Sequence, residues 1–186
     1  VGEYSKDRIR EMADEIGLLV AHKPDSQDIC FVPDGDYASF IENTTDQVLP
    51  TGNFVTPEGK VLGKHKGIIH YTVGQRKGLG LALGYPAFVL EIRPETNEVV
   101  IGTYEESLTY TVRANELNFM SVEQITEPVR IFAKIRYNHK GAWCTVERTG
   151  EDEIVCTFDE PIRAATPGQA VVLYDGEYVL GGGTIL

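Results

Sequence analysis

A single cysteine, Cys30, stands where a polar run turns apolar, in the stretch DSQDICFV. A thiol can attack as a nucleophile or carry sulfur once it ionises, but a free cysteine with a pKa near ~8.5 is mostly protonated at neutral pH. Asp25 and Asp28 oppose ionisation, and Lys23 partly offsets them. The alternative is a small side chain buried between two apolar neighbours. The residues alone leave both interpretations open.

The second candidate for chemistry is a cationic, glycine-rich segment over residues 59–90. It contains five Lys or Arg side chains, two histidines, seven glycines and no Asp or Glu. Cationic side chains and the exposed N–H groups of glycine loops together suit phosphate oxygens. The segment therefore favours a phosphate backbone as partner, with Gln75, Arg76 and Lys77 as candidate contacts. The alternative is a solvated basic loop that pairs with the acidic flanks.

The remaining cysteines and the histidines indicate structural roles. Cys144 and Cys156 lie in the strand patterns WCTVE and IVCTF, where alternation directs them into a core. No C-x-x-C pair occurs and no histidine has ligand-like spacing to a cysteine, so no metal site is predicted. We expect the four histidines at the surface or beside phosphate rather than in catalysis: His22, His65, His70 and His139.

Two short helices are predicted at the start of the chain. Ser5 is a suitable N-cap for a helix over about residues 6–16, and Gly17 is placed to end it. A brief second helix is expected near Tyr37 to Ile41. The sequence between them predicts an irregular loop, which places Cys30 in a loop or at a strand edge.

The rest of the chain predicts β structure. Recurrent glycine over residues 52–84 favours short strands joined by tight turns, and AFVLEI and EVVIGT flanking PETN predict a hairpin. After a join near Tyr104 to Leu108, six segments with turn signals between them predict a small barrel or sandwich. Alternation in AKIRYN places Ile135 and Tyr137 on one face and Lys134 and Arg136 on the other. The six segments are VRANELNFM, VRIFAKIRYN, WCTVERT, EIVCTF, QAVVLY and EYVLGGGTIL.

Composition bounds the class of protein. The chain has 186 residues, with 17 Lys and Arg against 28 Asp and Glu and a net charge of −11. This balance alone argues against a simple electrostatic grip on nucleic acid or an anionic membrane. No apolar run of 18 residues and no secretory signal occurs, and three irregularly spaced cysteines do not form a secreted disulfide framework. We expect a soluble, cytoplasmic protein. The valine at position 1 and the helix that follows at once indicate a fragment.

Four phrases in this order form a family pattern: KPDSQDICFV, GKVLGKHKGIIHYTVGQRKGLGL, AKIRYN and TPGQAVVLYDGEYVLGGGTI. On these phrases the chain resembles the tRNA-specific 2-thiouridylases from its first helix to its C-terminus. The resemblance implies an enzyme that replaces the 2-oxygen of the wobble uridine in tRNA anticodons with sulfur, after ATP has adenylated that oxygen. A cysteine persulfide supplies the sulfur, and in the family it lies on the cysteine of D-S-x-x-I-C-F, here Cys30.

The resemblance also implies the partners. A persulfide sulfur-donor protein would load Cys30, and because the sulfur must then reach an RNA base, we expect an exposed, mobile loop. The family's tRNA contacts fall on Arg136, Tyr137 and Gln169; an arginine suits a phosphate oxygen and a tyrosine can stack on a base or ribose. ATP, with Mg, would bind an N-terminal pyrophosphatase domain whose glycine- and serine-rich loop this sequence lacks. No cofactor site is therefore expected in this chain. The family further implies a disulfide bond.

The implied fold is mainly β with a short α N-terminal segment. Residues 1–42 would be the tail of the ATP pyrophosphatase domain and the catalytic-cysteine loop, residues 43–106 a central glycine-rich domain, and residues 107–186 an antiparallel β-barrel similar to the second domain of elongation factor Tu. Such a C-terminal portion would be inactive alone. Fold likeness by itself does not establish this function.

Two other functions are compatible with the residues. The first is a non-catalytic RNA-binding module on a translation-factor-like barrel, in which Cys30 only packs. The second is a free-standing sulfur carrier of the rhodanese kind, which would need a cationic or amide-lined loop around its cysteine. The stretch DSQDICFV shows neither, so this hypothesis ranks last.

Overall fold

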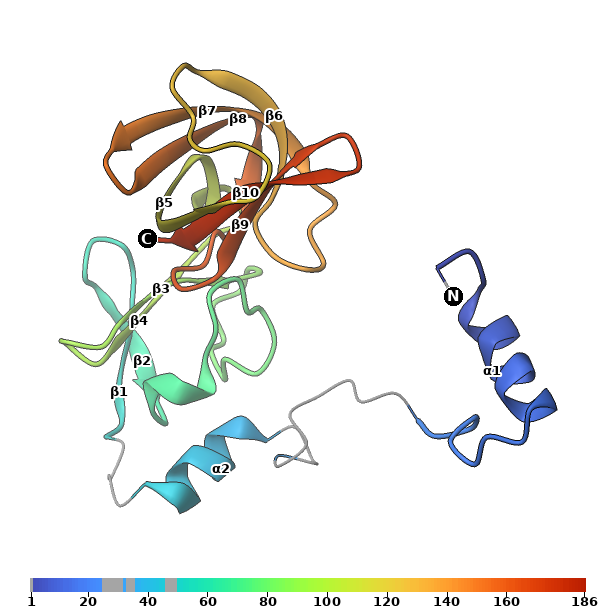
Figure 1. Cartoon of the computed structure of the whole chain (residues 1–186). Coiled ribbons are helices and arrows are strands. Elements are labelled where there is room, and N and C mark those ends of the chain that lie inside the picture. The colour runs from blue at the N-terminus through green and yellow to red at the C-terminus, as the bar shows by residue number, and fades with distance from the viewer. Residues whose placement is uncertain (1, 25–31, 33–35, 46–49) are drawn as a thin grey trace. The chain divides into compact units, whose positions relative to one another are not determined.

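A computed structural model of the chain describes residues 2–24, 32, 36–45 and 50–186. The chain forms two units, residues 1–48 and residues 49–186, and each is described by itself. In the described residues the first unit carries two short helices, and the second is built mainly from strands (Figure 1). The predicted fold class, mainly β with a short α segment, a small central sheet and an antiparallel barrel, is confirmed.

Helix α1 (Lys6–Glu15) has the predicted bounds to within one residue. The Ser5 hydroxyl accepts a hydrogen bond from the backbone N–H of Arg8 at 3.3 Å, which satisfies one donor of the first turn. The chain leaves the helix through Gly17, whose φ of +71° is the left-handed conformation that glycine adopts without steric cost.

Helix α2 (Tyr37–Thr44) starts where it is predicted and continues three residues further than expected. The Asp36 carboxylate accepts from the backbone N–H of Ser39 at 3.1 Å and from the Ser39 hydroxyl at 2.7 Å, so this N-cap is doubly bonded. Only Ala38 of this helix is buried.

The second unit begins with a four-stranded sheet in the order β2-β1-β4-β3. β1 and β4 run parallel at its centre, and the two outer pairs are antiparallel. β3 and β4 form the predicted hairpin. The strands are β1 (Gly52–Val55), β2 (Val61–His65), β3 (Phe88–Arg93) and β4 (Glu98–Gly102).

The prediction of further short strands up to residue 84 is wrong. Residues 66–87 form loops and one 3₁₀ turn, Ile68–His70, with no strand. Gly74 and Gly78 have φ of +85° and +75°, which lie outside the β region and interrupt any strand ladder. This segment nevertheless folds onto the sheet, because Tyr71 and Leu79 lie in the sheet's core.

The six segments predicted to form a barrel or sandwich form a closed barrel, in the order β10-β5-β8-β7-β6-β9. Every neighbouring pair is antiparallel, and the pairing of β9 with β10 completes the ring. A closed barrel leaves no unpaired edge. The strands are β5 (Leu108–Phe119), β6 (Val129–Lys134), β7 (Ala142–Gly150), β8 (Glu153–Arg163), β9 (Ala170–Asp175) and β10 (Tyr178–Ile185).

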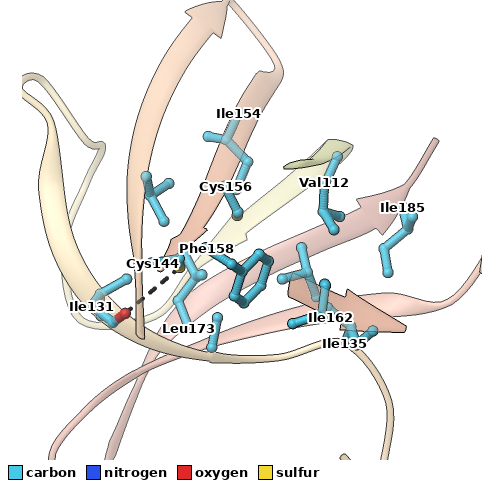
Figure 2. Close-up of a cluster of buried hydrophobic side chains, with 14 of the residues drawn as sticks. Val112, Ile131, Ile135, Cys144, Ile154, Cys156, Phe158, Ile162, Leu173 and Ile185 are labelled. Atoms are coloured by element: carbon cyan, nitrogen blue, oxygen red, sulfur yellow. Dashed lines mark hydrogen bonds between the residues drawn. The ribbon is translucent and has the colours of Figure 1, made fainter. Parts of the chain in front are cut away.

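Alternate residues of these strands fill the barrel interior (Figure 2). Val112, Ile154, Phe158 and Leu173 point inward from three of the strands, and each is at most 2% exposed. Burial of apolar side chains is the main stabilising contribution in such a barrel, at about 25 cal/mol per Å² removed from water. The barrel interior is therefore a packed core.

Cys144 and Cys156 are buried free thiols in this interior, as the strand alternation predicts. The Cys144 thiol donates to the carbonyl oxygen of Ile131 at 3.6 Å (Figure 2). A hydrogen bond with the Cys144 side chain, together with burial, raises the pKa of Cys156, so this sulfur stays protonated at neutral pH. Both behave as small core side chains, and no disulfide joins them.

His65 corrects the expectation of a surface position, because it is only 2% exposed. Its Nε2 lies 3.1 Å from the carbonyl oxygen of Asn97, and its Nδ1 accepts from the N–H of Gly67 at 3.1 Å. An acceptor on one side and a donor on the other require the neutral ring protonated at Nε2. The imidazole thereby joins β2 to the turn before β4.

The free energy of unfolding is expected to fall in mild acid because of His65. Burial lowers the pKa of this ring, and the charge of Lys64 acts in the same direction. The unfolded chain therefore binds the proton first as the pH falls, so the stabilisation is complete above the ordinary histidine pKa of about 6.5 and is lost below it. Urea unfolding at pH values of about 7.5 and about 5.5 measures this difference.

The variant His65→Gln provides the control for this prediction. Burial also lowers the pKa of His139, so His139 contributes with the same sign and its Gln variant must be measured alongside. The pH dependence of the unfolding free energy should shrink in His65→Gln relative to wild type. An unchanged dependence in that variant would show that His65 titrates alike in the folded and unfolded chain.

Candidate functional site

A hollow of about 660 Å³ opens on the barrel beside the paired strands β6 and β9. One wall follows β6 into the loop after it, and the other follows β9 and the residue before it. All three residues that the family resemblance marked for tRNA, Arg136, Tyr137 and Gln169, line this hollow together. Its residues are Lys134, Arg136, Tyr137, Asn138, Gln169, Ala170, Val172 and Tyr174.

Tyr137 lies at the tip of a turn, which corrects the alternation predicted for AKIRYN. β6 ends at Lys134, and the N–H of His139 donates to the carbonyl oxygen of Arg136 at 3.1 Å. Ile135 is fully buried, whereas Tyr137 is 96% exposed and lines the same hollow as Arg136. The turn releases Tyr137 from the strand's two-residue period, so its ring faces solvent and is available for stacking.

Arg136 is held in place by the chain that follows β8. Its Nη1 donates to the carbonyl oxygens of Arg163 and Ala164, both at 3.0 Å. Ala164 has φ +55°, a conformation that costs an alanine about 1–2 kcal/mol and that these bonds help to hold. The guanidinium is thus oriented before any ligand binds, and its remaining N–H groups are left for an acceptor.

Gln169 is positioned by backbone hydrogen bonds and keeps its side chain exposed. Its N–H donates to the carbonyl oxygen of Thr166 at 3.1 Å, and its own carbonyl accepts from Ile185 at 2.7 Å. The backbone of Gln169 is therefore fixed at the rim of the hollow. Its exposed side-chain amide can donate hydrogen bonds to a base or ribose there and accept hydrogen bonds from it.

The hollow is cationic. Within the described residues neither Lys134 nor Arg136 has a carboxylate at ion-pair distance. The Lys134 ammonium lies 5.9 Å from the ring centroid of Tyr174, within cation–π range. Burial and these two cations lower the pKa of His139, so its ring is neutral at physiological pH. The site's charge at neutral pH comes from lysine and arginine and suits an anionic ligand.

A second hollow, of about 450 Å³, shares Arg136 and Gln169 with the first. Its far side is the Thr72–Gln75 loop of the glycine-rich segment. Gln75 therefore lines the same hollow as Arg136 and Gln169, two of the residues that the family resemblance assigns to tRNA binding. Gln75 uses its amide on its own loop: Oε1 accepts from the N–H of Thr72 at 3.0 Å, and Nε2 donates to the carbonyl of Lys77 at 2.9 Å. Its side chain therefore shapes the loop.

Close packing at Gly74 and two cation–π contacts fix this loop and its sheet against the barrel. A Cβ at Gly74, where φ is +85°, would lie 2.6 Å from the Cβ of Ala164, so the approach requires glycine. The Arg163 guanidinium lies 5.2 Å from the ring centroid of Phe88 and 5.9 Å from that of Tyr104. These cation–π contacts join β8 to β3 and to the turn after β4.

The other predicted site residues are not gathered here. Arg76 and Lys77 are exposed on the loop after Gln75, and neither lines the two hollows. Cys30 lies outside the described residues. In the part of the chain that the structure describes, no group of three His, Cys, Asp or Glu side chains could hold a metal ion. No helix among those residues has the length and apolarity to span a membrane.

The sequence reasoning missed Lys134, Tyr174 and Arg163 as site residues. The alternation in AKIRYN, which places Lys134 on the face of Arg136, is the signal that could have identified Lys134. Tyr174 joins the site because β9 pairs with β6, and Arg163 because β8 ends beside the central sheet. No local spacing of residues in the sequence predicts that β9 pairs with β6 or that β8 ends beside the central sheet.

Comparison with known families divides the chain into three matched segments. Residues 109–185 match the family described as the aminomethyltransferase beta-barrel domain, and residues 38–103 match the tRNA methyl transferase PRC-barrel domain. Residues 1–34 match the tRNA methyl transferase HUP domain. The first two segments coincide with the barrel and with α2 plus the central sheet.

Curated relatives match the whole chain. A tRNA-specific 2-thiouridylase MnmA of Lachnoclostridium phytofermentans is 61% identical over 186 residues, which are 100% of this chain and 52% of that protein. Proteins of the same name from Carboxydothermus hydrogenoformans and Clostridioides difficile are 52% and 49% identical over 185 residues, with 51% of each covered. The chain spans about half the length of the curated relatives it matches.

Proposed function

Because the chain belongs to the tRNA-specific 2-thiouridylase family, we propose that it forms part of a tRNA sulfurtransferase that replaces the 2-oxygen of the wobble uridine with sulfur. Its substrate is tRNA in the cytoplasm. The single observation that carries the proposal is the gathering of Arg136, Tyr137 and Gln169 around one cationic hollow. Residues 33 positions apart in the chain meet there because β6 pairs with β9.

Cys30 carries the sulfur in this proposal. The Cys30 thiolate attacks the outer sulfur of a donor-protein persulfide, and the donor leaves as a thiolate. The terminal sulfur of the Cys30 persulfide then attacks C2 of the activated uridine and displaces AMP. A second thiol, from the part of the enzyme that this chain does not include, attacks the Cys30 sulfur, so that the S–S bond breaks and a disulfide between the two cysteines is left. A persulfide is more acidic than a thiol, which lessens the opposition of the neighbouring Asp25 and Asp28 to ionisation. The burial of Cys144 and Cys156 supports Cys30 as the reactive sulfur, because neither of the other thiols is accessible.

The tRNA docks on the hollow and the adjoining loop. The free N–H groups of Arg136 bind a backbone phosphate, Tyr137 stacks on an exposed base or ribose, and Gln169 makes hydrogen bonds at the rim. Gln75 shapes the neighbouring loop, and Arg76 and Lys77 add phosphate contacts from it. The charge contrast supports this arrangement, since residues 59–90 hold five cations and no carboxylate in a chain of net charge −11.

The three matched segments support a proposed division of the chain into domains. Residues 1–42 are the tail of the ATP-binding domain with the cysteine loop, residues 43–106 the central domain, and residues 107–186 the barrel. ATP supplies the activation of the uridine oxygen. Residues 1–34, which match the HUP domain, contain only Gly2 and Gly17 and so no glycine-rich phosphate loop. These residues do not fit the nucleotide, and no activation step is assigned to them.

Replacing Arg136 by alanine is expected to weaken tRNA binding about tenfold, the cost of one charge-assisted hydrogen bond. A filter-binding titration with unmodified tRNA at fixed salt measures it. The matched control is Arg113→Ala on β5, which removes an exposed arginine paired with Glu153 at 2.6 Å, away from the hollow, and should leave the affinity unchanged.

Tyr137→Ala separates binding from folding in this test. Arg136→Ala frees two carbonyl groups and so also lowers stability, whereas Tyr137 is 96% exposed and its removal leaves the fold intact. Both variants should lose affinity. Wild-type affinity in both would refute the docking site.

A further inference from the structure

Three aromatic side chains form a row across the outer face of the barrel, on β7, β6 and β9. Phe132 pairs with Trp143 on one side and with Tyr174 on the other, so the three lie at one level of three neighbouring strands. The rings of Phe132 and Trp143 meet edge to face, with centroids 5.8 Å apart and an interplanar angle of 75°. Since strands lie about 4.8 Å apart, this aromatic row, Trp143, Phe132 and Tyr174, is roughly 10 Å long.

Cations flank the aromatic row at both ends. The Arg130 guanidinium lies 5.6 Å from the ring centroid of Trp143, and two hydrogen bonds to the Asp159 carboxylate, at 3.1 and 2.6 Å, hold it there. Lys134 lies over Tyr174 at the other end. Arg130, Phe132 and Lys134 alternate along β6, so cation, ring and cation face outward in sequence. Asp159 neutralises Arg130, and Lys134 provides the net charge.

The barrel does not need these rings for its core. Its interior is filled by inward-facing aliphatic side chains, Phe158 and the two cysteines, and Trp143 remains 51% exposed. About half of Trp143 therefore remains as a large flat surface that a ligand can contact. The row is also continuous with the cationic hollow, because Tyr174 belongs to both and Lys134, which flanks the row, lines the hollow.

We propose that the aromatic row binds unpaired nucleotides of RNA, with bases stacked on its exposed rings and phosphates near Lys134. This inference rests on the proposed function and extends the RNA surface from the hollow onto the face of β7, β6 and β9. Aromatic rings interleaved with cations suit single-stranded nucleic acid, because every base has a π face and every linkage an anionic phosphate. The exposed rings favour this partner over an acidic peptide, because a peptide backbone offers no bases to stack. The net charge of −11 disfavours a second copy of this chain.

Trp143 is the only tryptophan of the chain, so its fluorescence reports on this row alone. We would titrate the chain with a single-stranded RNA oligonucleotide and with the same sequence in a perfect duplex, while anisotropy of labelled RNA follows binding. Saturable quenching of Trp143 by the single strand, tighter than by the duplex, is expected because stacking needs unpaired bases. Bound single-stranded RNA without quenching overturns the proposal.

Trp143→Ala should weaken binding of the single strand about tenfold, and Trp143→Phe should retain most of the affinity. Tyr110→Ala removes an exposed aromatic ring of β5 and serves as the control, with no change expected. Suppose that Arg136→Ala weakens tRNA binding, while Trp143→Ala weakens the binding of neither tRNA nor the single-stranded oligonucleotide. The aromatic row is then not an RNA surface, and the proposed function stands. If wild type binds no tRNA, the proposed function itself fails.

Discussion

Replacing Cys30 by serine is expected to abolish 2-thiolation of tRNA, by at least about a thousandfold, without changing tRNA affinity. A serine hydroxyl has nearly the size of a thiol but cannot form a persulfide, so the variant removes the sulfur carrier alone. The proposed tRNA surface lies on the barrel and its adjoining loop, within residues 49–186.

The assay uses an enzyme of the relatives' full length that carries this sequence, loaded with a persulfide donor. Alkylation and mass spectrometry then locate the persulfide, which should be found on Cys30 in wild type and be lost from that peptide in Cys30→Ser. Cys144→Ala is the control, because Cys144 is buried and should never carry the label. Thiolation at the wild-type rate in Cys30→Ser would favour the alternative of a non-catalytic RNA-binding module.

Phe158→Ala is expected to destabilise the second unit by about 3–5 kcal/mol. Phe158 is 2% exposed and belongs to the cluster that fills the barrel (Figure 2). Removing its ring loses the transfer free energy of the side chain and leaves a cavity among neighbours that strand pairing prevents from collapsing. Such a loss is a large share of the 5–15 kcal/mol that stabilises a typical domain.

Urea unfolding followed by circular dichroism measures this change in free energy. Thr157→Ala is the matched control, since Thr157 is the exposed neighbour of Phe158 on β8 and should change stability by less than about 0.5 kcal/mol. A Phe158→Ala variant within that same range would mean that the barrel interior is not the stabilising core.

Local rules predicted much of this fold. The N-cap at Ser5, the stop at Gly17, the hairpin around PETN and the six barrel strands all follow from capping, turn chemistry and two-residue alternation, which act within a few residues. The failures occur where distant residues decide. His65 is buried because the carbonyl of Asn97, 32 positions away, accepts from its ring. Tyr137 leaves the strand face because β6 ends early at a turn.

The sequence predicts only part of the candidate site, because contacts between distant residues also decide which side chains meet there. Arg136, Tyr137 and Gln169 were identified by family resemblance, and the structure brings them together. Lys134 and Tyr174 join them only through the register of β6 with β9, which no local pattern specifies. The pattern WCTVERT predicts only that Trp143 lies in a strand, because its position beside Phe132 depends on the register of β6 with β7. Strand register is set by the whole barrel.

The salt dependence of tRNA binding tests the central claim, that the cationic hollow holds tRNA phosphate, most directly. The logarithm of the dissociation constant is measured against the logarithm of salt concentration for wild type, Arg136→Ala and Arg113→Ala. Each phosphate contact contributes a slope of about 0.7 to 0.9, so Arg136→Ala should lower the slope by about one contact while Arg113→Ala keeps the wild-type value. A wild-type slope in Arg136→Ala would contradict the account.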